Sequence, residues 1–92
     1  MARHKIVDME KKKDRARRYA GYRCVLEDGR SVQAWVSADD LDLEFHGLDL
    51  KSVCKLAVER APEKDLESGE IVVQRALLIE VEAREQTSGR GR

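Results

Sequence analysis

The sequence predicts a small all-β domain with one short helix, and two segments carry that prediction. Residues 22–26 (YRCVL) and 32–36 (VQAWV) flank an acidic pair and a glycine, as the two strands of a β-hairpin do. Residues 71–81 (IVVQRALLIEV) are rich in the β-branched side chains that favour strands. The chain has 92 residues, which is enough for one domain with a single modest core.

The hairpin is predicted to have a three-residue loop at residues 27–29. In that register Cys24 lies opposite Val32, and apolar side chains gather on one face because side chains alternate along a strand. A two-residue turn would place Cys24 opposite Gln33 and mix apolar with polar residues on both faces. Gly29 supplies the positive φ that the longer loop requires. The apolar face then consists of Tyr22, Cys24, Leu26, Val32, Ala34 and Val36, and the other face carries Arg23, Val25, Ser31, Gln33 and Trp35.

The segments before and after the hairpin give weaker signals. Residues 6–9 (IVDM) indicate a short strand. Residues 10–20 (EKKKDRARRYA) suit either a marginal helix or a disordered segment, because they have no continuous apolar face. We therefore expect residues 1–21 to form a basic N-terminal arm, which can include a first strand. After the hairpin, Ser37 is in position to cap a short helix near residues 38–45.

Residues 50–61 are compatible with two structures. Six apolar residues of this segment recur at helical spacing, which would place them on one face of a helix. However, Cys54, Leu56 and Val58 also alternate with more polar neighbours, as in a half-buried strand. The spacing slightly favours the helix. Pro62 ends the element in either case.

Charge divides the chain into a basic and an acidic part. Residues 1–23 hold nine Lys or Arg against three Asp or Glu, a balance of +6. Residues 24–70 hold five against twelve, a balance of −7. A basic segment beside an acidic domain indicates an electrostatic role, most simply binding to nucleic acid. The alternative is a solvated, partly disordered tail that only aids solubility.

Several absences narrow the class of protein. No segment has the apolar length of a membrane span, and the N-terminus lacks the apolar stretch of a secretion signal, so we expect a cytoplasmic protein. Cys24 and Cys54 are not at metal-ligand spacing and are expected to be free, mostly buried thiols. The sequence has no catalytic motif, calcium loop or phosphate-binding glycine loop. We therefore expect neither an enzyme nor a cofactor or metal site.

Two blocks of the sequence resemble bacterial translation initiation factor one. Residues 22–37 (YRCVLEDGRSVQAWVS) are similar to the family stretch F-R-V-E-L-E-N-G-H-V-V-x-A-H-I-S. Residues 55–72 (KLAVERAPEKDLESGEIV) are similar to its K-V-x-V-E-L-x-P-Y-D-L-x-x-G-R-I-V block, with one extra residue after Pro62. The resemblance covers about residues 1–73, and it is carried by the order of the two blocks rather than by either alone.

The resemblance implies a five-stranded OB-type barrel at residues 22–82. Beyond it, the composition of residues 83–92, with arginines set among glycines, indicates a flexible tail. The resemblance favours a strand at residues 53–59. It also implies RNA as the partner, with the small ribosomal subunit as the first candidate. The chain departs from the family where a basic segment after the serine becomes residues 38–41 (ADDL). An Sm-like barrel fits residues 26–45 as well.

We expect a monomeric RNA-binding protein, similar to a translation initiation factor, that holds phosphates with its basic arm and stacks a base on Trp35. One alternative is a protein-interaction module that uses the acidic residues 39–49. Another is an Sm-like or α+β small domain with a different role, and the α+β form requires residues 50–61 to be helical. The predicted RNA-binding residues are Lys11, Lys12, Lys13, Arg15, Arg17, Arg18, Arg23, Trp35, Lys55 and Arg75.

Overall fold

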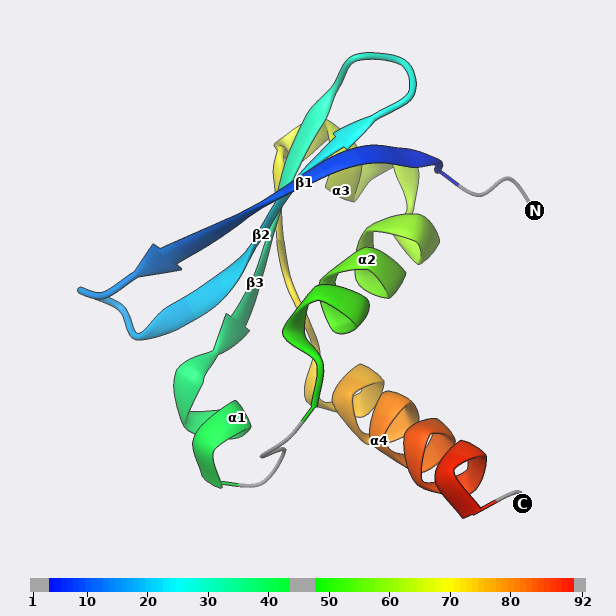
Figure 1. The fold of residues 1–92 in the computed structure, drawn as a ribbon. Helices are drawn as coiled ribbons and strands as arrows, with labels where there is room; N and C mark the ends of the chain where they lie inside the picture. Colours follow the sequence, from blue (N-terminus) through cyan, green and yellow to red (C-terminus); the bar gives the residue numbers. More distant parts are fainter. Residues whose placement is uncertain (1–3, 44–47, 91–92) are drawn as a thin grey trace.

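The fold is an open sheet with its helices on one side (Figure 1). The computed structural model describes residues 4–43 and 48–90 of the chain. The strand order is β1-β2-β3-β4, with the first three strands antiparallel and β4 parallel to β3. Helix α2 packs across β2 and β3 on one face, and no described helix lies across the other. The elements are β1 (Ile6–Asp14), β2 (Tyr19–Leu26), β3 (Ser31–Ser37), α1 (Ala38–Leu43), α2 (Leu50–Arg60), α3 (Glu63–Ser68), β4 (Glu70–Val72) and α4 (Arg75–Arg90).

The predicted all-β, five-stranded OB-type barrel is wrong. The described residues form a four-stranded mixed sheet and four helices, and the two edge strands β1 and β4 do not pair with each other. A barrel requires that closure, because every strand must have two neighbours. The open sheet is also inconsistent with an Sm-like barrel. The α+β arrangement is the alternative that agrees with this topology.

The segment that decides the fold is α2, which replaces the strand favoured by the family resemblance. Its buried side chains follow the helical period and face the sheet. A strand would bury Leu56 together with Cys54 and Val58, but Leu56 is only half-buried. The helical interpretation of the spacing is therefore confirmed. The buried residues of α2 are Val53, Cys54, Ala57 and Val58.

The β2–β3 hairpin has the predicted register and the predicted three-residue loop. Cys24 lies opposite Val32. The Leu26 N–H donates to the Arg30 carbonyl across the loop at 2.8 Å, and Gly29 has the positive φ of 97° that the loop needs. Alternation along the two strands then buries one face, as expected. The buried residues of this face are Cys24, Leu26, Val32, Ala34 and Val36.

Strand β1 occupies much of the segment that the sequence assigns to a marginal helix or to disorder. It pairs with β2 from Ile6 to Asp14, with a register shift between Ile6 and Asp8. Met9 lies opposite Cys24 and packs against the core. Pairing with β2 satisfies the backbone hydrogen bonds of β1, and an apolar face on the segment itself is not needed for this. The basic arm is therefore a strand and a turn, and not the marginal helix or disordered segment that its composition suggests.

The predicted strand at residues 71–81 is divided between two elements. Strand β4 ends at Val72, and helix α4 begins at Arg75. Leu78 and Val81 are buried three residues apart, so one face of α4 packs toward α2. The apolar residues of this segment fit the repeat of a strand and that of a helix equally well. The contact with α2 favours the helix.

Two further predictions concern the short helix after the hairpin and the C-terminal tail. A short helix does follow the hairpin, as α1 at Ala38–Leu43, and its expected end at Phe45 lies outside the described residues. The predicted flexible tail at residues 83–92 overlaps α4, which is helical as far as Arg90. Residues 91–92 lie outside the described residues.

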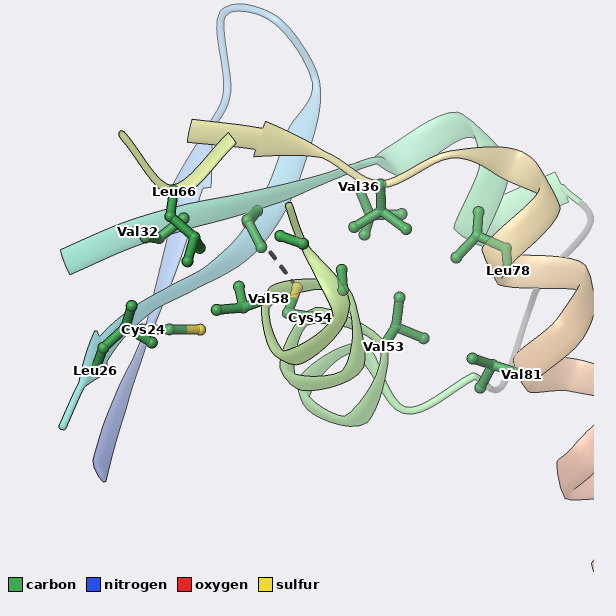
Figure 2. Packing of buried hydrophobic residues seen from close by; sticks show 14 residues of the cluster. Cys24, Leu26, Val32, Val36, Val53, Cys54, Val58, Leu66, Leu78 and Val81 are labelled. Atoms are coloured by element: carbon green, nitrogen blue, oxygen red, sulfur yellow. Dashed lines mark hydrogen bonds between the residues drawn. The ribbon is translucent and has the colours of Figure 1, made fainter. Parts of the chain in front are cut away.

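The core lies between the inner face of the sheet and α2 (Figure 2). Leu66 of α3 and Leu78 of α4 extend it toward its two ends. Cys24 and Cys54 are both buried free thiols, as the sequence predicts. Burial raises the pKa of Cys24 to about 11 and that of Cys54 to about 12, so both stay protonated at neutral pH.

Candidate nucleic-acid interface

The predicted RNA-binding residues do not form one site. Four lie in or beside the turn of the β1–β2 hairpin: Lys13, Arg15, Arg17 and Arg18. Three lie on the open face of the sheet: Lys12, Arg23 and Trp35. The other three lie elsewhere in the fold: Lys11, Lys55 and Arg75.

Trp35 lies on the open face, as the hairpin register predicts. Its neighbours Ala34 and Val36 are fully buried in the core, so the indole points to the opposite side. Its ring centre lies 6.5 Å from that of Tyr19, and the two ring planes are inclined at 45°. Both residues are only half-buried, so part of each ring can contact a ligand.

Gly21 lies opposite Trp35, and at this point only glycine fits. A Cβ atom on residue 21 would stand 1.7 Å from the carbonyl oxygen of Ala34, which is far inside van der Waals contact. On the open face of β2, position 21 therefore has no side chain between Tyr19 and Arg23. A flat ligand can approach the Tyr19–Trp35 ring pair without obstruction from this position.

The centre of the open face is not basic. Arg23 donates a hydrogen bond to the Ser31 hydroxyl at 3.2 Å. The Lys12 amine lies 3.4 Å from a Glu10 carboxylate oxygen. A nucleic-acid backbone would not be attracted across β1, because acids outnumber bases there. The β1 side chains on this face are Asp8, Glu10, Lys12 and Asp14.

Basic residues gather instead at the outer end of the β1–β2 hairpin, which projects away from α2 and α4 (Figure 1). A shallow cleft of about 420 Å³ opens there between the turn and the start of α1. Tyr19 belongs both to the lining of this cleft and to the ring pair with Trp35, so the two features share this residue. The cleft is lined by Lys13, Asp14, Arg15, Arg18, Tyr19, Ala20 and Ala38.

Local contacts hold the turn in shape. A carboxylate oxygen of Asp14 accepts a hydrogen bond from the Arg17 backbone N–H at 3.3 Å. Arg18 has a positive φ of 58°, and its Nε donates to a carboxylate oxygen of Asp39 at 3.0 Å. Arg15 is exposed and has no ion pair with another described residue. Arg17 Nε lies 4.0 Å from a carboxylate oxygen of Asp14, whereas Lys13 and Arg15 are exposed and have no ion pair with a described residue.

The acidic residues 39–49 are largely used inside the protein. Asp39 contacts Arg18, and Asp40 contacts Arg75 at 3.1 Å, which joins α1 to α4. Asp49 accepts hydrogen bonds at the start of α2. Residues 44–47 lie outside the described part of the chain. Arg75 thus serves an internal contact and is not part of the basic cluster at the turn.

Tyr19 is the candidate residue that the sequence analysis missed. The signal was available: strict alternation from Arg23 back through position 21 places residue 19 on the same face as Trp35. It went unused because residues 10–20 carry no strand pattern. The pairing of residues 19–21 with both β1 and β3 shows that β2 begins before residue 22.

No known protein family, curated protein or solved structure matches this chain. Among the described residues, no group of His, Cys, Asp or Glu side chains is placed to hold a metal ion. In the same part of the chain, no helix combines the length and apolarity needed to cross a membrane. Function must therefore be argued from the geometry of the uncovered surfaces.

Proposed function

We propose that this protein is a non-catalytic RNA-binding domain whose contact surface is the outer end of the β1–β2 hairpin together with the Tyr19–Trp35 ring pair. One observation carries the proposal: the cleft lined by Lys13, Arg15 and Arg18 also includes Tyr19, whose ring pairs with that of Trp35. Exposed cations beside stacking surfaces are the combination that proteins use for single-stranded nucleic acid.

In this proposal, charge and stacking act on different parts of the RNA. Arg15 and Arg17 at the tip of the turn hold phosphates, while an unpaired base stacks on Trp35. Each stacked base contributes roughly 1–3 kcal/mol and each phosphate contact adds about 0.7 to the salt slope for a single strand. The acidic β1 residues on the open face confine the RNA to the hairpin end.

The small ribosomal subunit remains the first candidate for the RNA that is bound. This part of the proposal rests on the sequence resemblance to initiation factor one and not on the fold. Because the chain forms an open sheet, any binding to the ribosome must use a surface different from that of an OB barrel. The protein-interaction alternative has less support, since Asp39, Asp40 and Asp49 already have partners within the chain.

The test replaces the two cations nearest the tip of the turn. Arg15→Ala/Arg17→Ala should weaken binding to a short single-stranded RNA at least tenfold and reduce the salt slope by about 1.4, because two phosphate contacts are lost. The matched control is Lys5→Ala/Lys64→Ala, which removes the same charge from exposed positions outside the cleft. Binding is measured by fluorescence anisotropy over a range of salt concentrations. Equal losses in the two double variants would mean that only net charge matters, and the proposed surface would be rejected.

A further inference from the structure

The outer edge of β1 carries unpaired backbone groups. β1 is the first strand of the sheet, so within residues 4–43 and 48–90 only one of its edges has a partner. Even-numbered residues of β2 bond to β3, as the bonds from Leu26 N–H to the Arg30 carbonyl and from Ala38 N–H to the Arg18 carbonyl indicate. The alternate residues of β2 therefore bond to Asp8, Glu10, Lys12 and Asp14 of β1. The N–H and C=O groups of Met9, Lys11 and Lys13 point to the free edge.

The side chains of these edge residues lie on the helix-covered side of the sheet. Met9 lies opposite the buried Cys24 and packs against the core, and Lys11 and Lys13 continue along the same side of β1. A shallow cavity of about 290 Å³ lies between residues 6–9 at the start of β1 and the lysines of α2. An added strand along residues 9–13 would thus meet this cavity at Met9. The cavity is lined by Ile6, Val7, Asp8, Met9, Lys51 and Lys55.

The helix-covered side of the free edge is basic. Lys11, Lys13, Lys51 and Lys55 are exposed, and within the described residues none of them forms an ion pair. Lys12, on the other side of the strand, is compensated by Glu10. Asp8 is the acidic residue in the lining of the cavity. The edge therefore attracts negative charge on its helix-covered side only.

From the free edge and its lysines we infer that β1 binds an acidic, extended peptide segment as a fifth strand. The unpaired N–H and C=O groups of β1 suit another strand, which offers both donors and acceptors. A phosphate backbone has no donors for the carbonyls, so RNA satisfies this edge poorly. Lysines on an edge oppose pairing with a second copy of the same strand, because like charges would face each other. This inference does not rest on the proposed function, although Lys13 belongs to both surfaces.

The peptide should carry acidic residues at every second position. Alternate side chains of a strand are spaced about 6.6 Å apart on one face, which matches the spacing of Lys11 and Lys13. Its other face would lie beside Glu10 and Lys12, where neutral side chains are suitable. The register shift near Val7 ends regular pairing at that point, so the added strand should run along residues 9–13.

The first experiment uses the peptide Thr-Glu-Val-Glu-Thr-Glu-Val-Glu, and a control peptide of the same composition with its glutamates contiguous. We expect at least tenfold tighter binding of the alternating peptide, measured by fluorescence anisotropy. Hydrogen exchange should show new protection of the Met9, Lys11 and Lys13 amides, whereas the Glu10 and Lys12 amides are already bonded to β2. Equal binding of both peptides, or binding without protection of the three amides, would overturn the inference. So would protection of these amides by single-stranded RNA but not by peptide.

The second experiment separates the backbone from the charge. Lys11→Pro removes an N–H that points away from β2, a position on an edge strand where proline is tolerated. Lys11→Thr removes the same charge but keeps that N–H. Peptide binding should fall at least tenfold further in Lys11→Pro than in Lys11→Thr, and circular dichroism should show that both variants fold. If Lys11→Pro is unfolded, two double variants are compared instead: Lys51→Glu/Lys55→Glu and, as the control, Lys5→Glu/Lys64→Glu. The first should lose tenfold more peptide affinity than the control. Strand addition would be contradicted if the two variants that are compared bound the peptide equally well.

Discussion

At the scale of single residues, Trp35 connects the fold to the proposed function. The indole is placed by strand alternation, since Ala34 and Val36 fill the core on either side of it. Tyr19 supports one side of the ring, and Gly21 leaves the adjacent face free of a side chain. A half-buried aromatic pair of this kind contributes modestly to stability and offers a flat surface to a ligand.

Trp35→Ala is therefore expected to separate binding from folding. It should cost roughly 1–3 kcal/mol of RNA binding by the loss of stacking. The free energy of unfolding should fall by less than the 2–5 kcal/mol that is typical of truncating a buried leucine, for which Leu78→Ala is the comparison. Denaturant titration and anisotropy measure the two effects. Ile79→Ala, at an exposed apolar position of α4, is the binding control. An unfolded Trp35→Ala variant would show that the ring is a core residue.

At the scale of elements, α2 is stabilised by a cap at its N-terminus as well as by the packing of its apolar face. The Asp49 carboxylate accepts hydrogen bonds from the Lys51 N–H at 3.2 Å and from the Ser52 hydroxyl at 2.8 Å. These bonds satisfy a donor that the first turn of the helix leaves unpaired. At the other end, Pro62 follows directly after the last turn and prevents its continuation.

Asp49→Ala should lower the free energy of unfolding by about 0.5–2 kcal/mol through loss of this cap. RNA binding should not change, because Asp49 lies outside the cleft at the hairpin end. The control is Glu67→Ala, which removes an exposed carboxylate of α3 that has no hydrogen bond or ion pair in the described structure. Urea denaturation of both variants measures the difference. Equal stabilities would argue against the cap.

At the scale of the whole molecule, the buried thiols connect the core to pH. Cys24 and Cys54 come from opposite layers, the sheet and α2, so both are exposed together only when the core opens. Burial raises the pKa of these thiols from an ordinary value of 9.0 to about 11 and about 12. The folded state therefore holds their protons more tightly than the unfolded state does.

Stability should consequently decrease in alkaline solution. The contribution of the two thiols is fully present below pH 9.0 and is lost as the pH rises toward about 11 and about 12, because the unfolded chain ionises first. Denaturant titrations at about pH 8 and about pH 10 measure the loss. These two pH values lie roughly one unit below and one unit above the ordinary thiol pKa. The Cys24→Ala/Cys54→Ala variant should be less stable than the original protein at either pH. Its free energy of unfolding should nevertheless fall by less between the two pH values. An unchanged pH dependence in this variant would assign the loss to other groups.

The sequence by itself determined the features that depend on neighbours along the chain. The β2–β3 register follows from alternation and from Gly29, and it places Trp35 outward before any tertiary contact is known. The short helix after Ser37 and the burial of both cysteines were predictable for similarly local reasons. The basic hairpin tip was visible as a charge cluster, although its conformation was not.

Only the tertiary structure decided the segments whose patterns fit two periods or none. Residues 50–60 and 75–81 hold apolar residues compatible with a strand or a helix, and they become helices because each packs its apolar face against a formed neighbour. Strand β1 lacks an apolar face and exists because β2 supplies its hydrogen bonds. The Tyr19–Trp35 pair and the basic free edge follow from that pairing. Partners distant in sequence provide the free energy that makes these choices, so no local pattern contains them.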